Sequence, residues 1–218
     1  MPQLDLRTKT ALIVDDNRNR STLLRRVLRE LGLTRVNEVP DVADGASGLQ
    51  ATWTDIAFVE KDLAFLDGYQ FARMVRFDPL TQNPFLPVVL LCSTVDRSSI
   101  LRAINTGIDA VMAKPLTHGE VNSKVGQLLG RPLTYIRTGS GYFGPDRRRR
   151  PDPGYGGHER RKVDEAIRLG PGAEFVRQDT WRREPRHAET TPLRPMTVDI
   201  DDIAAAAPAG KRSFAQVL

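Results

Sequence analysis

The amino-acid sequence predicts an α/β fold: a doubly wound, five-stranded parallel sheet, followed by a largely irregular C-terminal extension. Two observations carry this prediction. Between residues 11 and 129, five short apolar segments alternate with five segments of helical periodicity, which is the pattern of a parallel sheet covered by helices on both faces. Beyond Gly130 the apolar periodicity stops, and proline, glycine and arginine become frequent.

The predicted elements follow one another without long gaps. Strands are expected at residues 11–14, 36–39, 55–59, 86–92 and 110–113, and helices at 18–31, 43–53, 67–76, 98–106 and 117–129. In the first helix, leucine and valine recur at helical spacing opposite arginines, and Gly32 ends it. The carboxyl ends of parallel strands share one edge of a sheet, where such folds bind ligands. We therefore expect one edge to gather Asp15, Asp16, Glu60, Cys92 or Ser93, and Lys114.

Composition excludes several classes of protein. The single cysteine, Cys92, rules out an internal disulfide and is typical of a reducing compartment. The longest apolar run, residues 86–92, is too short to cross a bilayer, and the first ten residues lack the apolar core of a signal peptide. We expect a cytoplasmic protein with no membrane span.

The net charge of +5 is unevenly distributed. Of the 32 basic and 27 acidic residues, 15 of each lie within residues 1–130, which leaves 17 basic and 12 acidic residues beyond them. The sequence therefore predicts a neutral globular domain at 1–131 and a basic extension at 132–218.

The segment Asp55 to Gly68 is central to the function. Its strand ends on Glu60, and Asp67-Gly68 leads into a helix seven and eight residues later. This layout resembles the phosphorylation loop of bacterial response-regulator receiver domains of the chemotaxis type, where the strand ends on a phosphoacceptor aspartate. The resemblance implies the flavodoxin-like receiver fold and a role in two-component, or phosphorelay, signalling through a protein partner.

Further motifs extend the resemblance over the whole predicted domain. Asp15-Asp16 matches the acidic pair that holds Mg²⁺ in the family, and Lys114-Pro115, with Gly107 seven residues before the lysine, matches the end of its last strand. The resemblance implies that Pro115 follows a cis peptide bond. It also makes Asp15 and Asp16, with Glu60, a candidate weak Mg²⁺ site, although two acids near Lys114 are equally consistent with an internal salt bridge.

Three positions depart from the family pattern. Glu60 stands where the acceptor is aspartate, and its extra methylene adds about 1.5 Å of reach; a misplacement of that order costs roughly a hundredfold in rate. Cys92 falls at the place of a Ser/Thr hydroxyl, with Ser93 beside it as a replacement, and a thiol is a poor hydrogen-bond donor. Val111 falls at the place of the aromatic switch residue. We expect a degenerate receiver, a non-catalytic adaptor that works without phosphorylation.

Two interpretations of Glu60 remain open. Either the chemistry has simply been lost, or Glu60 lies beside Lys114 and imitates the phosphorylated state. Cys92, at the end of a buried strand, is expected to be a small apolar filler. The alternative function is a phosphorylated response regulator with an atypical acceptor site.

The extension contains a repeat at residues 142–162. The pattern Tyr-x-Gly-x-acid followed by three basic residues occurs twice, 13 residues apart, beginning at Tyr142 and at Tyr155. It resembles the arginine-rich tails of chemotaxis-type receivers that bind cyclic di-GMP. Rings would stack on bases, and guanidinium groups would hold phosphates or guanine edges. The candidate ligand-binding residues are Tyr142, Arg147, Arg148, Arg149, Arg150, Tyr155, Arg160, Arg161 and Lys162.

We expect the repeat to be disordered without its ligand. The rival ligands are an acidic protein, anionic lipid and nucleic acid; no helix-turn-helix pattern follows the receiver, so a standard DNA-binding output is not expected. Residues 163–196 read as a linker, and 197–218 as a candidate docking segment. No catalytic output domain is visible in the sequence, so we do not expect an enzyme.

Overall fold

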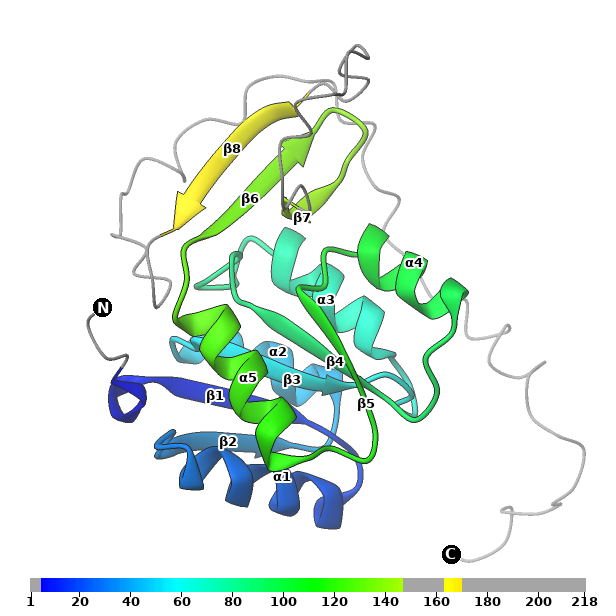
Figure 1. The fold of residues 1–218 in the computed structure, drawn as a ribbon. Helices are drawn as coiled ribbons and strands as arrows, with labels where there is room; N and C mark the ends of the chain where they lie inside the picture. Colours follow the sequence, from blue (N-terminus) through cyan, green and yellow to red (C-terminus); the bar gives the residue numbers. More distant parts are fainter. Residues whose placement is uncertain (1–4, 147–162, 170–218) are drawn as a thin grey trace, which may run out of the picture. The chain divides into compact units, whose positions relative to one another are not determined.

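The computed structural model describes residues 5–146 and 163–169, and its first five strands form a parallel sheet (Figure 1). The strand order is β2-β1-β3-β4-β5, as the sequence predicts for a doubly wound fold. These strands are β1 (Thr10–Val14), β2 (Arg35–Val39), β3 (Ile56–Glu60), β4 (Val88–Cys92) and β5 (Ala110–Ala113). The helices are a short 3₁₀ turn η1 (Leu6–Thr8), α1 (Arg18–Glu30), α2 (Val42–Ala51), α3 (Gly68–Phe77), α4 (Arg97–Asn105) and α5 (His118–Leu129).

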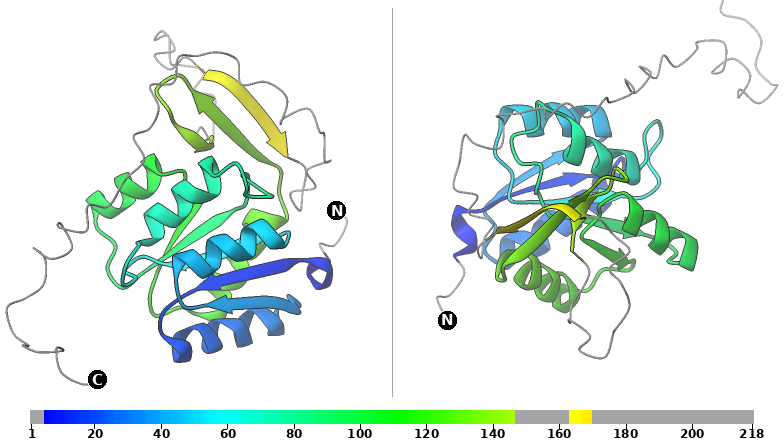
Figure 2. Two further views of the ribbon diagram at one scale, coloured as in Figure 1. Left: turned by 180° about the vertical axis from the view of Figure 1, so that it is seen from behind. Right: turned by 90° about the horizontal axis from the view of Figure 1, so that it is seen from above.

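Helices cover both faces of this sheet, as Figure 2 shows from two further directions. Along β1, Leu12 and Val14 point into a core shared with α2, α3 and α4, whereas Ala11 and Ile13 point into a core shared with α1 and α5. The alternation follows from the period of two in a strand. Since β1, β3 and β4 are buried along their whole length, their near-continuous apolar sequences are accounted for.

Capping residues fix where the helices begin. The side chain of Asp67 accepts a hydrogen bond from the amide of Gln70, and the Gln70 side chain accepts one from the Asp67 amide, which makes a capping box at the start of α3. Thr117 and Glu120 form the same arrangement at the start of α5. These caps place the loops that precede α3 and α5 at the carboxyl edge of the sheet.

The extension is more ordered than the sequence predicts. A second, antiparallel sheet has the strand order β7-β6-β8. Its strands are β6 (Leu133–Thr138), β7 (Phe143–Pro145) and β8 (Val163–Leu169). The prediction of a linker beginning at residue 163 is therefore wrong for β8, and the prediction of disorder from residue 142 is wrong for β7. Residues 147–162 connect β7 to β8 and lie outside the described residues.

The second sheet has an apolar contact with the receiver fold. Phe143, Tyr135 and Leu169 pack with Phe85, which lies in the loop before β4. The Phe85 ring meets the rings of Tyr135 and Phe143 edge to face, with centroids 5.5 Å apart in each pair. Such contacts are the preferred geometry of aromatic pairs, so the second sheet shares a core with the loop before β4.

A buried polar network lies beneath this aromatic cluster. The guanidinium of Arg76 donates to Asp109 at 2.7 Å and to the carbonyls of Leu86 and Gly107, each at 2.8 Å. The Tyr135 hydroxyl donates to the other oxygen of Asp109 at 2.6 Å. Because an unpaired charge in such a place is costly, these bonds tie α3 and the start of β5 to β6.

Two glycines allow a close backbone approach at the same junction. Gly107 has a φ of +79° and ends α4, as the sequence predicts. A Cβ atom added to Gly144 would lie 2.6 Å from the Cα atom of Gly107. A side chain at Gly144 would therefore separate β7 from the end of α4.

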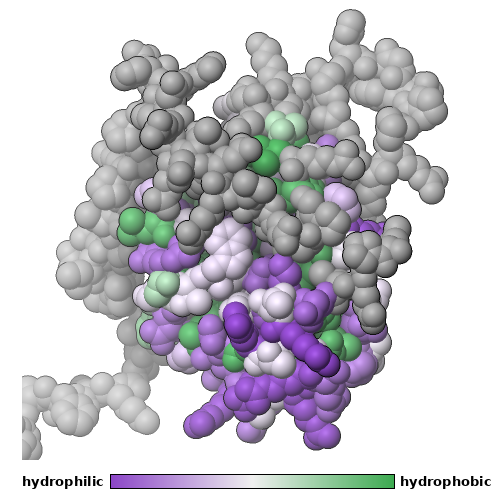
Figure 3. Space-filling view, turned by 90° about the vertical axis from the view of Figure 1, so that its left-hand side faces the viewer, coloured by the Kyte–Doolittle hydropathy of each residue, from purple (hydrophilic) through white to green (hydrophobic). Residues whose placement is uncertain are grey.

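The surface shows few extended apolar areas on the face drawn in Figure 3. Hydrophilic side chains dominate its coloured part, and hydrophobic ones gather only in small, separate groups. Within residues 5–146 and 163–169, no helix combines the length and apolar character needed to cross a membrane.

Candidate functional site at the carboxyl edge of the sheet

The carboxyl edge brings together the polar residues that the strand ends predict. Asp15 follows β1, Glu60 ends β3, Cys92 ends β4 and Lys114 follows β5. The charges of Glu60 and Lys114 both act on the Cys92 thiol, and the charge of Glu60 also acts on Arg20 of α1. These groups are therefore electrostatic neighbours, as expected.

Glu60 and Lys114 are in direct contact. The Lys114 ammonium donates a hydrogen bond to the Glu60 carboxylate, and the two form an ion pair. Glu60 is 4 % exposed and Lys114 18 % exposed, so water screens this pair only in part. The Lys114 amide donates to the Cys92 carbonyl at 2.8 Å, and the peptide bond to Pro115 is cis, as the resemblance implies.

Gly68 explains the Asp-Gly pair that follows β3. A Cβ atom at this position would lie 2.6 Å from the backbone carbonyl oxygen of Glu60 and 2.6 Å from Leu90. The amide of Gly68 donates to the Lys61 carbonyl at 3.0 Å. The glycine thus lets α3 begin directly against the end of β3, which fixes the backbone that carries Glu60.

The acidic pair is bound by an arginine that the sequence pattern does not single out. The Arg20 side chain donates to Asp15 through Nε, at 3.1 and 3.2 Å, and through a terminal nitrogen at 2.7 Å, and it donates to Asp16 at 3.0 Å. Asp15 also accepts from the Asn17 amide at 2.8 Å. The available signal was an arginine four and five residues after the two acids, on the first turn of a helix.

The surrounding acids stabilise the charged form of the Arg20 guanidinium. The hydrogen bond to Asp15 is the main cause that raises the pKa of the Arg20 guanidinium, against an opposing effect of burial, and the charges of Asp15, Glu60 and Asp16 raise it further. One cation on α1 therefore faces three carboxylates at the edge of the sheet.

These contacts bear on the magnesium site expected from the resemblance. Magnesium takes oxygen ligands in a strict octahedral arrangement. Among the residues that the structure describes, no group of three or more Asp, Glu, His or Cys side chains is placed to hold a metal ion. Asp15 and Asp16 are bound by Arg20, and Glu60 by Lys114. In this arrangement the residues do not fit a magnesium ion.

Two other departures from the family pattern have clear structural positions. Cys92 is fully buried in the core beneath α3 and α4, and burial raises the pKa of its thiol, which favours the filler interpretation. Ser93 is exposed. Val111 is half-buried and packs against the core on that face of the sheet, so no aromatic ring stands there to change rotamer.

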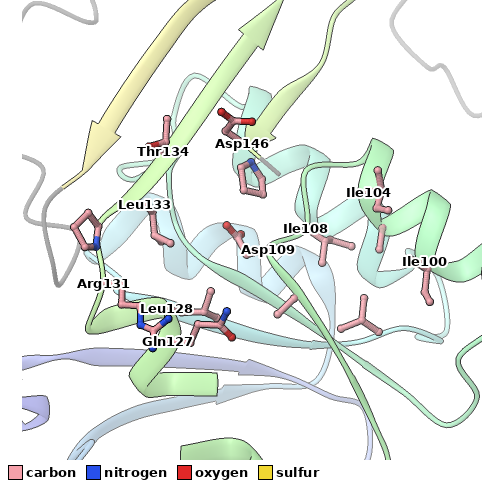
Figure 4. A pocket seen from close by; sticks show the side chains of 15 residues that line it. Ile100, Ile104, Ile108, Asp109, Gln127, Leu128, Arg131, Leu133, Thr134 and Asp146 are labelled. Atoms are coloured by element: carbon pink, nitrogen blue, oxygen red, sulfur yellow. The ribbon is translucent and has the colours of Figure 1, made fainter. Parts of the chain in front are cut away.

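A groove lies beside Val111, between α4 and α5 (Figure 4). Its volume is about 750 Å³, and its walls include Ile100 and Ile104 of α4 and Leu128 of α5. Leu133 and Thr134 of β6 line the groove as well, together with Asp146, which follows β7. The extension therefore contributes to the surface beside β5.

The first repeat unit of the extension is partly structural. Tyr142 is half-buried, and its hydroxyl donates to the Pro145 carbonyl at 3.0 Å, while Phe143 is buried in the aromatic cluster. This placement disagrees with the prediction that Tyr142 belongs to a segment disordered without ligand. The remaining predicted tail residues, Arg147, Arg148, Arg149, Arg150, Tyr155, Arg160, Arg161 and Lys162, lie outside the described residues, as do the expected docking segment 197–218 and most of the linker.

Comparison with known proteins supports the receiver architecture. The family model of the response regulator receiver domain matches residues 11–126. The chain is 26% identical over 120 residues to the chemotaxis protein CheY of Pseudomonas aeruginosa, a match that covers 55% of this chain and 95% of the relative. Among solved structures, a two-component response regulator from Clostridium difficile is similar, with a TM-score of 0.52 and 25% identity over 57% of this chain and 98% of its own.

One similar structure holds a metal ion. The receiver domain of a sensor histidine kinase from Pseudomonas aeruginosa has a magnesium ion coordinated in its active-site cleft. It has a TM-score of 0.50 and 24% identity, over 56% of this chain and 98% of its own. At this identity the comparison shows a shared fold.

Proposed function

Because the chain belongs to the response regulator receiver domain family, and therefore to two-component signalling, we propose that it is a non-catalytic adaptor that works without a phosphorylation cycle. The contact between Glu60 and Lys114 carries this proposal. The lysine that would face a phosphoryl group is neutralised by a carboxylate of the chain itself. Glu60 then holds the receiver in one state, in place of a reversible modification.

Several features of the site support a fixed state. Glu60 is almost fully buried and its carboxylate is bound to Lys114, so it is a poor in-line nucleophile for a phosphoryl donor. Cys92 offers a buried thiol in place of a hydroxyl. Val111 provides no ring that links the site to the groove beside β5. A phosphoryl group at Glu60 would thus lack a hydroxyl partner and an aromatic relay.

The proposed partner surface lies on and beside α4. Val95, Ile100 and Leu101 are exposed apolar residues, each between 40% and 48% accessible. Ile100 also lines the groove between α4 and α5. An apolar surface of this kind, with polar residues around it, is typical of a protein contact, so we propose that a signalling protein binds there.

Incubation with acetyl phosphate and Mg²⁺ tests the independence from phosphorylation. Intact-protein mass spectrometry should show no added phosphoryl group on the wild-type chain. A mass increase that disappears in Glu60→Gln would overturn the proposal and favour a phosphorylated response regulator with an atypical acceptor. A receiver domain with an acceptor aspartate, treated in parallel, controls for the activity of the phosphoryl donor.

The Glu60→Gln variant separates imitation of phosphorylation from simple loss of chemistry. If the carboxylate maintains an active state, amide resonances of groove residues such as Val111 and Gln127 should shift in Glu60→Gln, because Lys114 loses its counter-charge. If the resonance shifts are confined to residues next to Glu60 and Lys114, Glu60 does not imitate phosphorylation, and the interpretation of an inert scaffold is favoured. Lys9→Gln, which removes a different sheet-edge ion pair, with Asp55, is the matched control.

We also propose that the arginine-containing segment 147–162 binds cyclic di-GMP. The support comes from the repeat in the sequence and from connectivity: β7 precedes the segment, β8 follows it, and both strands pair with β6. A segment held at both ends loses less conformational entropy on binding than a free tail. The rival ligands are an acidic protein, anionic lipid and nucleic acid.

Calorimetric titration of the full chain distinguishes these ligands. Binding of cyclic di-GMP, and none of GMP or a short random RNA, is expected. Because a base–aromatic stack contributes about 1–3 kcal/mol, Tyr155→Ala should weaken binding roughly tenfold or more, whereas an electrostatic tether would be almost unaffected. Equal binding of all three ligands, or no binding of the cyclic dinucleotide, removes the second-messenger proposal.

A further inference from the structure

The first turn of α1 carries a charge that is unfavourable for a helix. Asn17 caps α1, so Arg20 is the third helical residue, and the first turn contains no acidic side chain. A cation near a helix N-terminus is repelled by the partial positive charge of the exposed amides. The position must therefore be stabilised by contacts outside the helix.

Asp15 and Asp16 supply that stabilisation. Three donor contacts from Arg20 reach Asp15, whose side chain is 2% exposed, and a fourth reaches Asp16. Charge-assisted bonds from a guanidinium are short and directional. The Arg20 guanidinium is thus hydrogen-bonded to both aspartates.

We propose that Arg20 is a permanent internal substitute for a divalent cation, and that the acidic pair is closed to metal ions. The guanidinium makes the contacts of a bound cation: it binds both aspartates, and it lies in the field of Glu60. A metal ion at the same place would have to displace these bonds and to stand beside a positive charge. This proposal differs from the sequence-based prediction of a weak magnesium site, and a metal titration distinguishes the two.

The charges at the edge show why the substitution is favourable. Asp15, Asp16 and Glu60 are three carboxylates, and Arg20 and Lys114 are the two cations paired with them. Both cations belong to the chain, and they reduce the net charge of the three carboxylates from −3 to −1 without an ion from solution. The inference concerns the same site as the proposed adaptor function, but its test does not depend on phosphorylation or on a partner.

Titration of the full chain with Mn²⁺, followed by the electron paramagnetic resonance signal of the free ion, tests the substitution. The wild-type chain should bind no Mn²⁺ at the acidic pair. Arg20→Gln and Arg20→Ala should gain a Mn²⁺ site at concentrations at least tenfold below those at which wild type shows any binding, since a neighbouring unit charge at about 4 Å opposes binding strongly at a partly buried site. Mg²⁺ should compete with Mn²⁺ and should raise the melting temperature of both variants but not of wild type.

Two further variants locate the effect. Arg26→Ala removes a solvent-exposed arginine of the same helix, paired with Glu30, and should leave Mn²⁺ binding as in wild type. Asp15→Asn combined with Arg20→Gln should lose the binding gained by Arg20→Gln. Tight binding to the wild-type chain, no gain in either Arg20 variant, or a gain that persists in the Asp15→Asn double variant would overturn the proposal.

Discussion

Replacing Phe143 by alanine should destabilise the whole receiver, although Phe143 lies in the extension. The ring is 2% exposed and packs edge to face on Phe85, Phe77 and Tyr135, with centroid distances of 5.5, 6.2 and 6.5 Å. Loss of a fully buried phenylalanine costs about 3–5 kcal/mol. Phe77 is half-exposed, so water can enter part of the space, and the lower end, about 3 kcal/mol, is expected.

Urea unfolding followed by helical circular dichroism measures this loss. With a slope of about 2 kcal/mol per molar urea, the midpoint should fall by about 1.5 M. Phe65→Ala is the matched control, because the Phe65 ring is 94% exposed and its loss should change stability by less than about 0.5 kcal/mol. If Phe143→Ala and Phe65→Ala unfold at the same urea concentration, the second sheet does not unfold together with the receiver, and the prediction is wrong.

Three further predictions concern buried or capped groups. Tyr135→Phe removes the hydrogen bond to Asp109 and should lower the free energy of unfolding by about 1.5–3 kcal/mol, the range for bonds to charged groups; a loss below 0.5 kcal/mol in urea unfolding would contradict it. Burial raises the pKa of the Cys92 thiol, so a thiol reagent at pH 8 should modify the native protein far more slowly than the unfolded one, and equal rates would refute the buried position. Hydrogen bonds from the Ser99 amide and from the Ser98 hydroxyl lower the pKa of Asp96 to about 2. The stability that this cap gives to α4 is therefore complete above the ordinary aspartate pKa and is lost as the pH falls through about 2; a carboxyl titration by nuclear magnetic resonance with a midpoint near 4 would disprove it.

The parallel sheet and its edge were predictable because local signals agree with the global fold. Each strand is a short apolar run, each helix has an apolar stripe, and Gly107 ends α4 as its position indicates. The spacing between Glu60, Gly68 and Lys114 predicts one site, and the structure brings Glu60 into contact with Lys114. Residues far apart in the sequence meet here because the carboxyl ends of neighbouring parallel strands lie at the same edge of the sheet.

Other features depend on contacts that spacing does not reveal. Arg76 looks like an ordinary surface arginine at the end of a helix, yet it is 2% exposed, because carbonyls of distant loops and Asp109 surround it. Residues 133–138 do contain β-branched and aromatic residues, a strand signal that the proline- and arginine-rich context obscures. Residues 133–138 pair with β8, and residues 147–162 lie between the two strands in the sequence. Pairing between strands so far apart in the sequence leaves no signal in the local residue pattern.

The central position of β6 has a consequence for how the chain can change. Strand β6 pairs with β7 on one side and with β8 on the other. The segment that connects β7 to β8 therefore begins and ends on the same three-stranded sheet. The paired residues of the second sheet all lie outside 147–162, so an insertion in that segment changes none of them. If the segment binds a ligand as proposed, another peptide could be grafted in its place without changing Tyr135, Phe143 or Leu169, which pack in the aromatic cluster.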